Sequence, residues 1–286
     1  LLQNLKAGNY EVTQANAHLY FHSGQLELNP LTLTIYHGES VGTLQYRLKD
    51  SMLSFNQVAT AVDAESFFQS LFDFKPARVS GSLDFSSQAK AYLNQENCFE
   101  TMEAKGSFTV KNGVIAYINL PEITKQATET IMALAGKSIG NLQQIIEKLK
   151  PWNLANFDGN TPFQLLSIQY QTDGSGNLHF HLLLETKKLQ LKGEGDLNLS
   201  SHKVLAHMVA YIPTHDKSVR ALEHELGEGF PVIISGTIEK PIITPDKPII
   251  RKALSSIPLP KEVAKPLGEI KQHMNTIKTI KKTIAP

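Results

Sequence analysis

The stretch FPVIISGTIEKPIITPD, residues 230–246, predicts the closing part of a β-sheet. Residues 232–238 form a short apolar run typical of a strand, residues 239–241 predict a turn, and a second apolar run comes after the turn. Pro231 lacks the N–H group that a central strand position needs, so it suits a strand start or an edge. No side chain in the stretch has obvious catalytic chemistry. We therefore interpret it as the point where the chain leaves its sheet.

Strand patterns continue upstream over most of the chain. In the first 60 residues, for example, Leu31, Leu33 and Ile35 alternate with Thr32, Thr34 and Tyr36. A period of two places one row of side chains on each face of a strand. After residue 160, about six more short apolar runs occur at hairpin spacing. Because the connections are short, the strands should be largely antiparallel. The sequence predicts a mainly β fold, a meander with helical insertions, short helices packed on the sheet and a helical C-terminal tail.

Two segments break the strand pattern. Residues 61–74 begin with Asp63 as an N-cap and carry phenylalanines at helical spacing, which predicts a short helix laid against the sheet. Residues from about 120 to 150 have amphipathic helical spacing and predict a helical insertion between strands. Asn112-Gly113, in contrast, predicts a tight hairpin turn, because Asn-Gly readily adopts positive φ at both turn positions.

Charge is distributed unevenly along the chain. Residues 240–286 carry ten basic and three acidic side chains, net +7, whereas the remaining body carries 18 basic and 24 acidic side chains, net −6. From Val263, apolar residues recur every three or four positions with lysines between them, which predicts a basic amphipathic helix. We divide the chain into a β-rich region, 1–246, and a tail, 247–286. The tail contacts an anionic membrane surface, binds a partner or folds back on the acidic body; the candidates for the surface contact are Lys271, Lys278, Lys281 and Lys282.

Composition limits the classes of protein. A chain of 286 residues with 41% hydrophobic and 19% charged residues fits an ordered globular protein. No window approaches the ~18 continuous apolar residues of a membrane span, and no signal peptide is visible. The single cysteine, Cys98, excludes an intrachain disulfide and a cysteine-based zinc site. The chain begins at Leu1 without a methionine, and we interpret it as a fragment whose targeting segment lies upstream.

Several short motifs resemble catalytic or metal-binding sites, but each lacks the structural context that such a site needs. GKSIG at residues 136–140 matches the nucleophile elbow of serine hydrolases, but a predicted helix precedes it where the motif needs a strand. His179 and His181 lie on one face of a predicted strand, yet no third metal ligand stands at a convincing spacing. No predicted sheet face combines aromatic and basic residues as base-stacking sheets do. We therefore predict no enzymatic activity, cofactor, metal or nucleic-acid partner.

Five segments form an ordered pattern along the β-rich region. They are HLYFHSGQLELNPLTLTIYHGESVG (18–42), VSGSLDF (79–85), GSFTVKNGVIAYINL (106–120), LKGEGDLNL (191–199) and PVIISGTIEKPIITPD (231–246). In this order they resemble the C-terminal region of the AsmA family of Gram-negative envelope proteins, and the resemblance spans nearly all of residues 1–250. The tail after Lys247 is not part of the family pattern.

The resemblance implies a periplasmic protein, anchored to the inner membrane by an N-terminal segment missing from this chain, with a role in outer-membrane biogenesis and lipid homeostasis. It also implies a relation to bridge-like lipid-transfer proteins, in which a curved β-sheet forms a groove that shields acyl chains. The implied partners are a phospholipid or another acyl-chain lipid, and outer-membrane assembly proteins.

Two functions remain open for the apolar rows of the predicted strands. In the first, the rows line an open lipid groove. In the second, they form an ordinary closed core, and the protein is a periplasmic scaffold that influences outer-membrane protein assembly through protein contacts. The unpaired edges of the sheet or the basic tail would then dock the partner. The candidate groove residues are Leu31, Leu33, Ile35, Leu178, Phe180, Leu182, Leu189, Leu191, Leu197 and Leu199.

Overall fold

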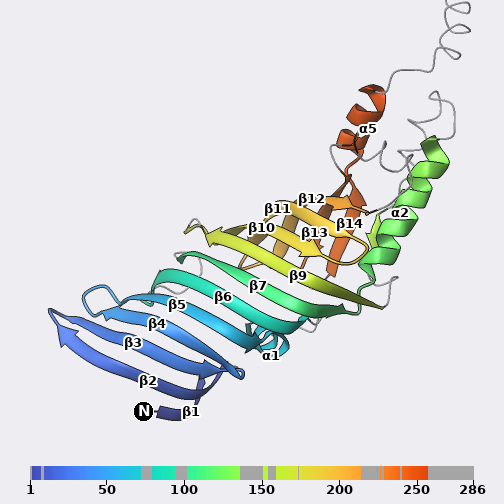
Figure 1. Ribbon diagram of the computed structural model, residues 1–286. Helices are drawn as coiled ribbons and strands as arrows, with labels where there is room; N and C mark the ends of the chain where they lie inside the picture. Colours follow the sequence, from blue (N-terminus) through green and yellow to red (C-terminus); the bar gives the residue numbers. More distant parts are fainter. Residues whose placement is uncertain are drawn as a thin grey trace, which may run out of the picture.

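One open, curled, antiparallel β-sheet forms the body of the protein (Figure 1). The computed structural model describes residues 2–7, 10–71, 79–94, 102–135, 151–153, 159–172, 174–213, 224, 226, 229–238 and 240–256. Within these residues the sheet has fourteen strands in the order β1-β2-β3-β4-β5-β6-β7-β9-β10-β11-β12-β13-β14-β8. The predicted mainly β, largely antiparallel fold with short helices is therefore confirmed.

Neighbouring strands in the sheet are mostly neighbours in the sequence, as a meander requires. The strands are β1 (Leu2–Ala7), β2 (Tyr10–His22), β3 (Gln25–Ile35), β4 (Gly38–Arg47), β5 (Met52–Asp63), β6 (Val79–Tyr92), β7 (Glu103–Ala116), β8 (Trp152–Asn153), β9 (Asn160–Thr172), β10 (Asn177–Glu185), β11 (Gln190–Asn198), β12 (Lys203–Tyr211), β13 (Phe230–Thr237) and β14 (Lys240–Pro245).

The two rims of the sheet, where strands end, differ in their connecting segments. On one rim lie the β2–β3, β4–β5 and β11–β12 turns, and no described helix begins there; we name it the turn rim. On the opposite rim begin α1 (Ala64–Leu71) after β5, α2 (Leu120–Ala135) after β7 and α5 (Lys247–Ser256) after β14; we name it the helix rim. Figure 1 shows the three helices on one side and the β2–β3 turn on the other.

α1 covers part of one sheet face beside the helix rim. Asp63 Oδ2 accepts a hydrogen bond from the Ser66 N–H at 2.8 Å, so Asp63 caps the helix as predicted. Phe67 is 8% exposed, and its ring stacks on Phe85 of β6 with 5.1 Å between the centroids. The helix is shorter than predicted, because residues 61–63 still belong to β5.

α2 is an insertion between β7 and β9, which pair directly in the sheet. Asn119 caps its first turn, accepting the Glu122 N–H on its side-chain oxygen at 3.2 Å. Ile123 is 4% exposed and belongs to the core, so α2 is anchored by its first turn. The rest of the predicted insertion, including the 136–140 motif, lies outside the described residues.

α5 begins the predicted tail and packs on the body. Asp246 Oδ1 accepts the Ile249 N–H at 3.2 Å, and Ile250 is 2% exposed within the core. The first ten residues after Asp246 are thus part of the folded unit. Residues 257–286 lie outside the described residues, with Lys271, Lys278, Lys281 and Lys282 among them.

Asn112-Gly113 does not form the predicted hairpin turn. β7 runs through both residues, and Asn112 has a φ of 52° inside the strand. The positive φ belongs to a β-bulge, since the pairing of β6 with β7 shifts register between Ser80 and Ser82. A Cβ at Gly113 would lie 2.1 Å from the Ser80 carbonyl oxygen. The hairpin prediction was wrong because Asn-Gly indicates positive φ, which bulges and turns both use.

The closing stretch forms the β13–β14 hairpin. Pro231 lies at the second position of β13, at a strand start as predicted. β13 is an internal strand between β12 and β14. β14 is not the last strand of the sheet either, because β8 pairs outside it at Ile242 and Ile243.

Candidate functional site

Strand register divides the sheet into an apolar face and a polar face. Cross-strand partners share a face, so Leu33, Ala59 and Phe85 lie on one line across the sheet. This line belongs to the face on which α1 packs, and we name it the apolar face. The opposite face carries exposed polar side chains such as Gln88 and Lys105, and we name it the polar face.

A row of buried residues crosses the apolar face beside the helix rim. It contains one residue from each of eight consecutive strands, all at most 8% exposed; we name it the buried row. Helix side chains such as Ile123 and Ile250 belong to the same core cluster. This half of the apolar face is therefore a closed core. The buried row is Val62, Leu83, Val110, Leu166, Leu184, Leu191, Ala210 and Phe230.

A second row crosses the apolar face nearer the turn rim, and we name it the open row. Its large side chains are only partly buried, while three smaller ones in its middle, Ala89, Ala104 and Thr172, are buried. The ring contacts of α1 reach Phe85 and Phe108, which lie outside this row on the helix-rim side. The open row is Leu28, Leu44, Phe55, Ala89, Ala104, Thr172, Leu178, Leu197 and Val204.

The predicted groove residues divide between these two environments. Eight of the ten lie within strands, and register places all eight on the apolar face; Leu189 and Leu199 flank β11. Leu31, Leu189 and Leu191 are buried, at 7%, 1% and 8% exposure, so they belong to closed packing. The seven that are partly exposed are Leu33, Ile35, Leu178, Phe180, Leu182, Leu197 and Leu199. The β3 group and the β10–β11 group are separated by five strands.

Polar side chains interrupt the apolar face between the two rows. Ser40 Oγ donates to Gln57 Oε1 at 2.7 Å, and Tyr170 Oη lies 2.7 Å from Ser87 Oγ. Burial raises the pKa of the Tyr170 hydroxyl. Gly106 leaves space for this ring, because a Cβ there would lie 2.7 Å from the Tyr170 oxygen. These groups were missed from the sequence, although Gln57 stands at an apolar-face position between Phe55 and Ala59.

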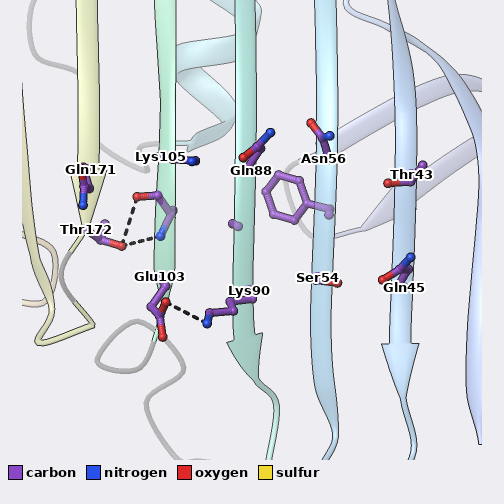
Figure 2. A pocket seen from close by; sticks show the side chains of 13 residues that line it. Thr43, Gln45, Ser54, Asn56, Gln88, Lys90, Glu103, Lys105, Gln171 and Thr172 are labelled. Carbon is purple, nitrogen blue, oxygen red and sulfur yellow. Dashed lines mark hydrogen bonds and ion pairs between the residues drawn. The ribbon is translucent and has the colours of Figure 1, made fainter.

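The polar face holds a shallow hollow of about 530 Å³ over β4, β5, β6, β7 and β9 (Figure 2). Figure 2 shows Asn56, Gln88 and Gln171 on different strands, with Lys90 Nζ 2.9 Å from Glu103 Oε2. These groups donate and accept hydrogen bonds. The hollow was not predicted from the sequence, because nine of its lining residues have the ordinary polar spacing of a solvated strand face, while the other four, Phe55, Ala89, Ala104 and Thr172, belong to the open row. The lining is Thr43, Gln45, Ser54, Phe55, Asn56, Gln88, Ala89, Lys90, Glu103, Ala104, Lys105, Gln171 and Thr172.

His179 and His181 lie on the polar face, each beside an acid of β11. His179 Nδ1 contacts Asp196 Oδ1, and His181 Nδ1 lies 3.5 Å from Glu194 Oε2. Within the described part of the chain, no group of three or more His, Cys, Asp or Glu residues is arranged to hold a metal ion. Among the described helices, none has the length and apolarity to cross a membrane.

A scan against protein-family models, a search of curated proteins and a search of solved structures each gave no match. The AsmA resemblance thus stays a prediction carried by its five sequence segments. The geometry of the sheet is the basis on which a function can be proposed.

Proposed function

We propose that this protein is a non-enzymatic lipid carrier of the bacterial envelope that shields acyl chains on the open row. The observation that carries the proposal is the partial exposure of large apolar side chains at both ends of that row, among them Leu28, Phe55, Leu178 and Leu197. Exposed apolar patches on a sheet face mark binding surfaces. The chemistry of the row fits a ligand with a long aliphatic part.

The dimensions of the open row support this ligand class. From Leu28 on β3 to Val204 on β12 the row crosses nine strands, and strands about 4.8 Å apart give a path of about 38 Å. The acyl chains of one leaflet span about 15 Å, half of a bilayer's hydrocarbon core. Each methylene that leaves water on this surface contributes about 0.8 kcal/mol. A phospholipid therefore fits the open row along the direction in which strands pair.

The AsmA resemblance supports an envelope setting for this activity. Under the proposal, the protein works in the periplasm, takes part in outer-membrane biogenesis and moves phospholipid between membranes. The polar groups between the two rows, Ser40, Gln57 and Tyr170, offer hydrogen bonds to an ester or headgroup beside the acyl chains.

The test places charge on the open row. Leu178 and Leu197 are direct cross-strand partners, so Leu178→Glu with Leu197→Glu puts two carboxylates where acyl chains would lie. The matched control is Leu205→Glu, at a 50% exposed leucine on the polar face. Phospholipid is extracted from each protein after incubation with vesicles and measured by mass spectrometry. We expect at least a roughly tenfold loss in the double variant and none in the control.

Two results would overturn the proposal. One is wild-type protein that takes up no phospholipid, and the other is equal lipid content in the double variant and in the Leu205→Glu control. Circular dichroism and thermal melting establish that each variant is folded.

A second candidate, the protein-docking scaffold, is favoured by the β14 edge. Among the described residues, β8 pairs with Ile242 and Ile243 of the six-residue β14, and Ile242 is 43% exposed. Exposed strand edges recruit added strands. Truncation after Ser256 keeps Ile250 in the core and removes the rest of the tail. Loss of captured assembly proteins with unchanged lipid content would favour the scaffold.

A further inference from the structure

Large apolar side chains protrude from the turn rim at successive strand ends. Phe21, at the end of β2, is 65% exposed, Leu48 in the β4–β5 turn is 55% exposed, and Leu93 after β6 is 51% exposed. Leu19 on β2 is 63% exposed. We name these four residues the lip. Isolated exposed apolar side chains are common, but four along one rim of one sheet form a pattern.

Backbone hydrogen bonds join the strand ends that carry the lip. The Leu48 N–H donates to the Gly24 carbonyl at 3.0 Å, and the Leu93 N–H donates to the Ser51 carbonyl at 3.0 Å. Each strand end is thus fixed to the turn before it. The lip is therefore a continuous edge spanning β2 to β6.

The lip continues into the open row without a change of face. Leu19 and Phe21 pair with Leu28 and Leu26 of β3, so all four side chains lie on the apolar face. Behind the tips, Tyr46 and Leu53 are partly exposed on the same face. The apolar surface therefore extends from the open row to the turn rim at this end of the sheet.

Charges beside the lip are largely paired, which lowers the cost of moving them toward a medium of low dielectric. Arg47 donates to both carboxylate oxygens of Asp50, from Nε at 2.8 Å and from Nη2 at 2.7 Å. Lys90 pairs with Glu103 at 2.9 Å. Lys49, next to Leu48, is exposed and has no ion pair among the described residues. A cationic side chain therefore lies next to Leu48 of the lip.

We propose that the lip contacts the surface of a lipid bilayer and that acyl chains pass across it between the bilayer and the open row. The inference rests on the proposed function, since it names the membrane contact of the same apolar surface. Single apolar side chains on separate strand ends, with a cation beside them, have the chemistry of an interfacial anchor. The orientation is set by the fold: the buried row and the three helices lie at the helix rim, and the lip lies at the opposite rim.

The first test measures insertion directly. Trp152 is the only tryptophan of the chain, so Trp152→Phe gives a silent background for Leu48→Trp and Leu93→Trp. Vesicles of phosphatidylethanolamine and phosphatidylglycerol with brominated acyl chains are the probe. Leu205→Trp on the polar face and Tyr117→Trp at the helix rim are controls of similar exposure, 50% and 59%. We expect emission from positions 48 and 93 to shift to shorter wavelength and to be quenched, while the controls do not change.

The second test measures the energetic role of the lip. Leu48→Ser with Leu93→Ser removes two exposed side chains, and we expect vesicle partitioning to fall at least about tenfold. Leu205→Ser is the matched control and should bind as the wild type does. Lipid content after loading from detergent micelles is measured on the same variants and should stay unchanged, because the open row is intact.

The outcomes separate the lip from the proposed function. The membrane contact of the lip would be overturned by unshifted tryptophan emission at positions 48 and 93, or by an equal loss of vesicle partitioning in the Leu205→Ser control. Lipid loading from micelles would still support the carrier in that case. Wild-type protein that loads no lipid from micelles contradicts the carrier itself. Vesicle-independent capture of a protein by the lip, abolished by Leu48→Ser, would also overturn the membrane assignment.

Discussion

The helix rim and the turn rim bound the same apolar face, yet they differ in almost every physical respect. Beside the helix rim, Leu83 and Val110 are fully buried, and helices close the surface. Toward the turn rim, Leu178 and Leu197 are partly exposed, and Leu48 and Leu93 protrude. The strands contribute similar aliphatic residues to both halves. The contrast indicates that the half beside the helix rim is closed packing, while large apolar side chains in the other half stay partly exposed.

The largest difference should appear between two phenylalanines. Phe67 of α1 is 8% exposed and packs on the rings of Phe85 and Phe108, whereas Phe21 on the turn rim is 65% exposed. We expect Phe67→Ala to lower the free energy of unfolding by about 3–5 kcal/mol. Phe21→Ala should lower it by less than about 0.5 kcal/mol. Urea unfolding followed by circular dichroism measures both, and equal losses would contradict the asymmetry.

Two leucines of β10 extend the contrast to a single strand. Leu184 is 2% exposed in the buried row, and Leu178 is partly exposed in the open row on the same face. Leu184→Ala should cost about 3 kcal/mol, because it leaves a cavity in a closed core. Leu178→Ala should cost about 1 kcal/mol, because only part of the side chain leaves contact with protein. The ratio from urea unfolding tests whether the two rows differ in packing.

Asp84, near the helix rim, makes a smaller and pH-dependent contribution to the free energy of unfolding. Its carboxylate accepts the Ala61 N–H at 3.0 Å, where β5 bends toward α1, and the Lys111 amine at 3.0 Å; these bonds lower the pKa of Asp84, the first more strongly. A lowered folded-state pKa adds stability above the ordinary carboxyl pKa of about 4, and this stability is lost as the pH falls through the folded value.

Asp84→Asn should therefore lower stability by about 1 kcal/mol at neutral pH and by less in acid. The matched change on the turn rim is Asp50→Asn, which removes a solvated ion pair with Arg47. We expect no measurable change in unfolding for Asp50→Asn. Unfolding curves at neutral and acidic pH compare the two variants. A loss of stability in Asp84→Asn that is the same at both pH values would contradict a stabilising role of the Asp84 carboxylate.

Small effects on stability are also expected at the lip. Leu48→Ser and Leu93→Ser replace side chains that are 55% and 51% exposed, so each should change the free energy of unfolding by no more than about 0.5 kcal/mol. Thermal unfolding monitored by circular dichroism measures the stability of both variants. A large loss would mean that these leucines hold the turns together instead of facing outward.

Much of the fold could be predicted because local chemistry and tertiary structure agree. Alternation around Leu31 and Leu178 places those residues on one face, and Asp63 caps α1 as its position indicates. Short connections predict the antiparallel meander. These features depend on residues close together in the sequence, which is the range over which pattern and propensity act.

The division of the apolar face could not be predicted, because it depends on contacts between distant segments. Leu191 and Leu197 have the same spacing in one strand, yet only the first lies in the buried row. The bulge at Asn112 had the same signature as a hairpin. The lip was missed because a leucine in a turn, such as Leu48, reveals its exposure only when neighbouring turns are placed beside it.

Photocrosslinking from the apolar face would show whether lipid occupies the open row. A benzophenone amino acid replaces Leu178 or Leu197 on the open row, Leu184 on the buried row, or Leu205 on the polar face, and the full-length protein is illuminated in cells. We predict phospholipid adducts from positions 178 and 197, few from 184 and none from 205. Adducts absent from both open-row positions, or equally abundant at 205, would contradict the lipid-carrier proposal.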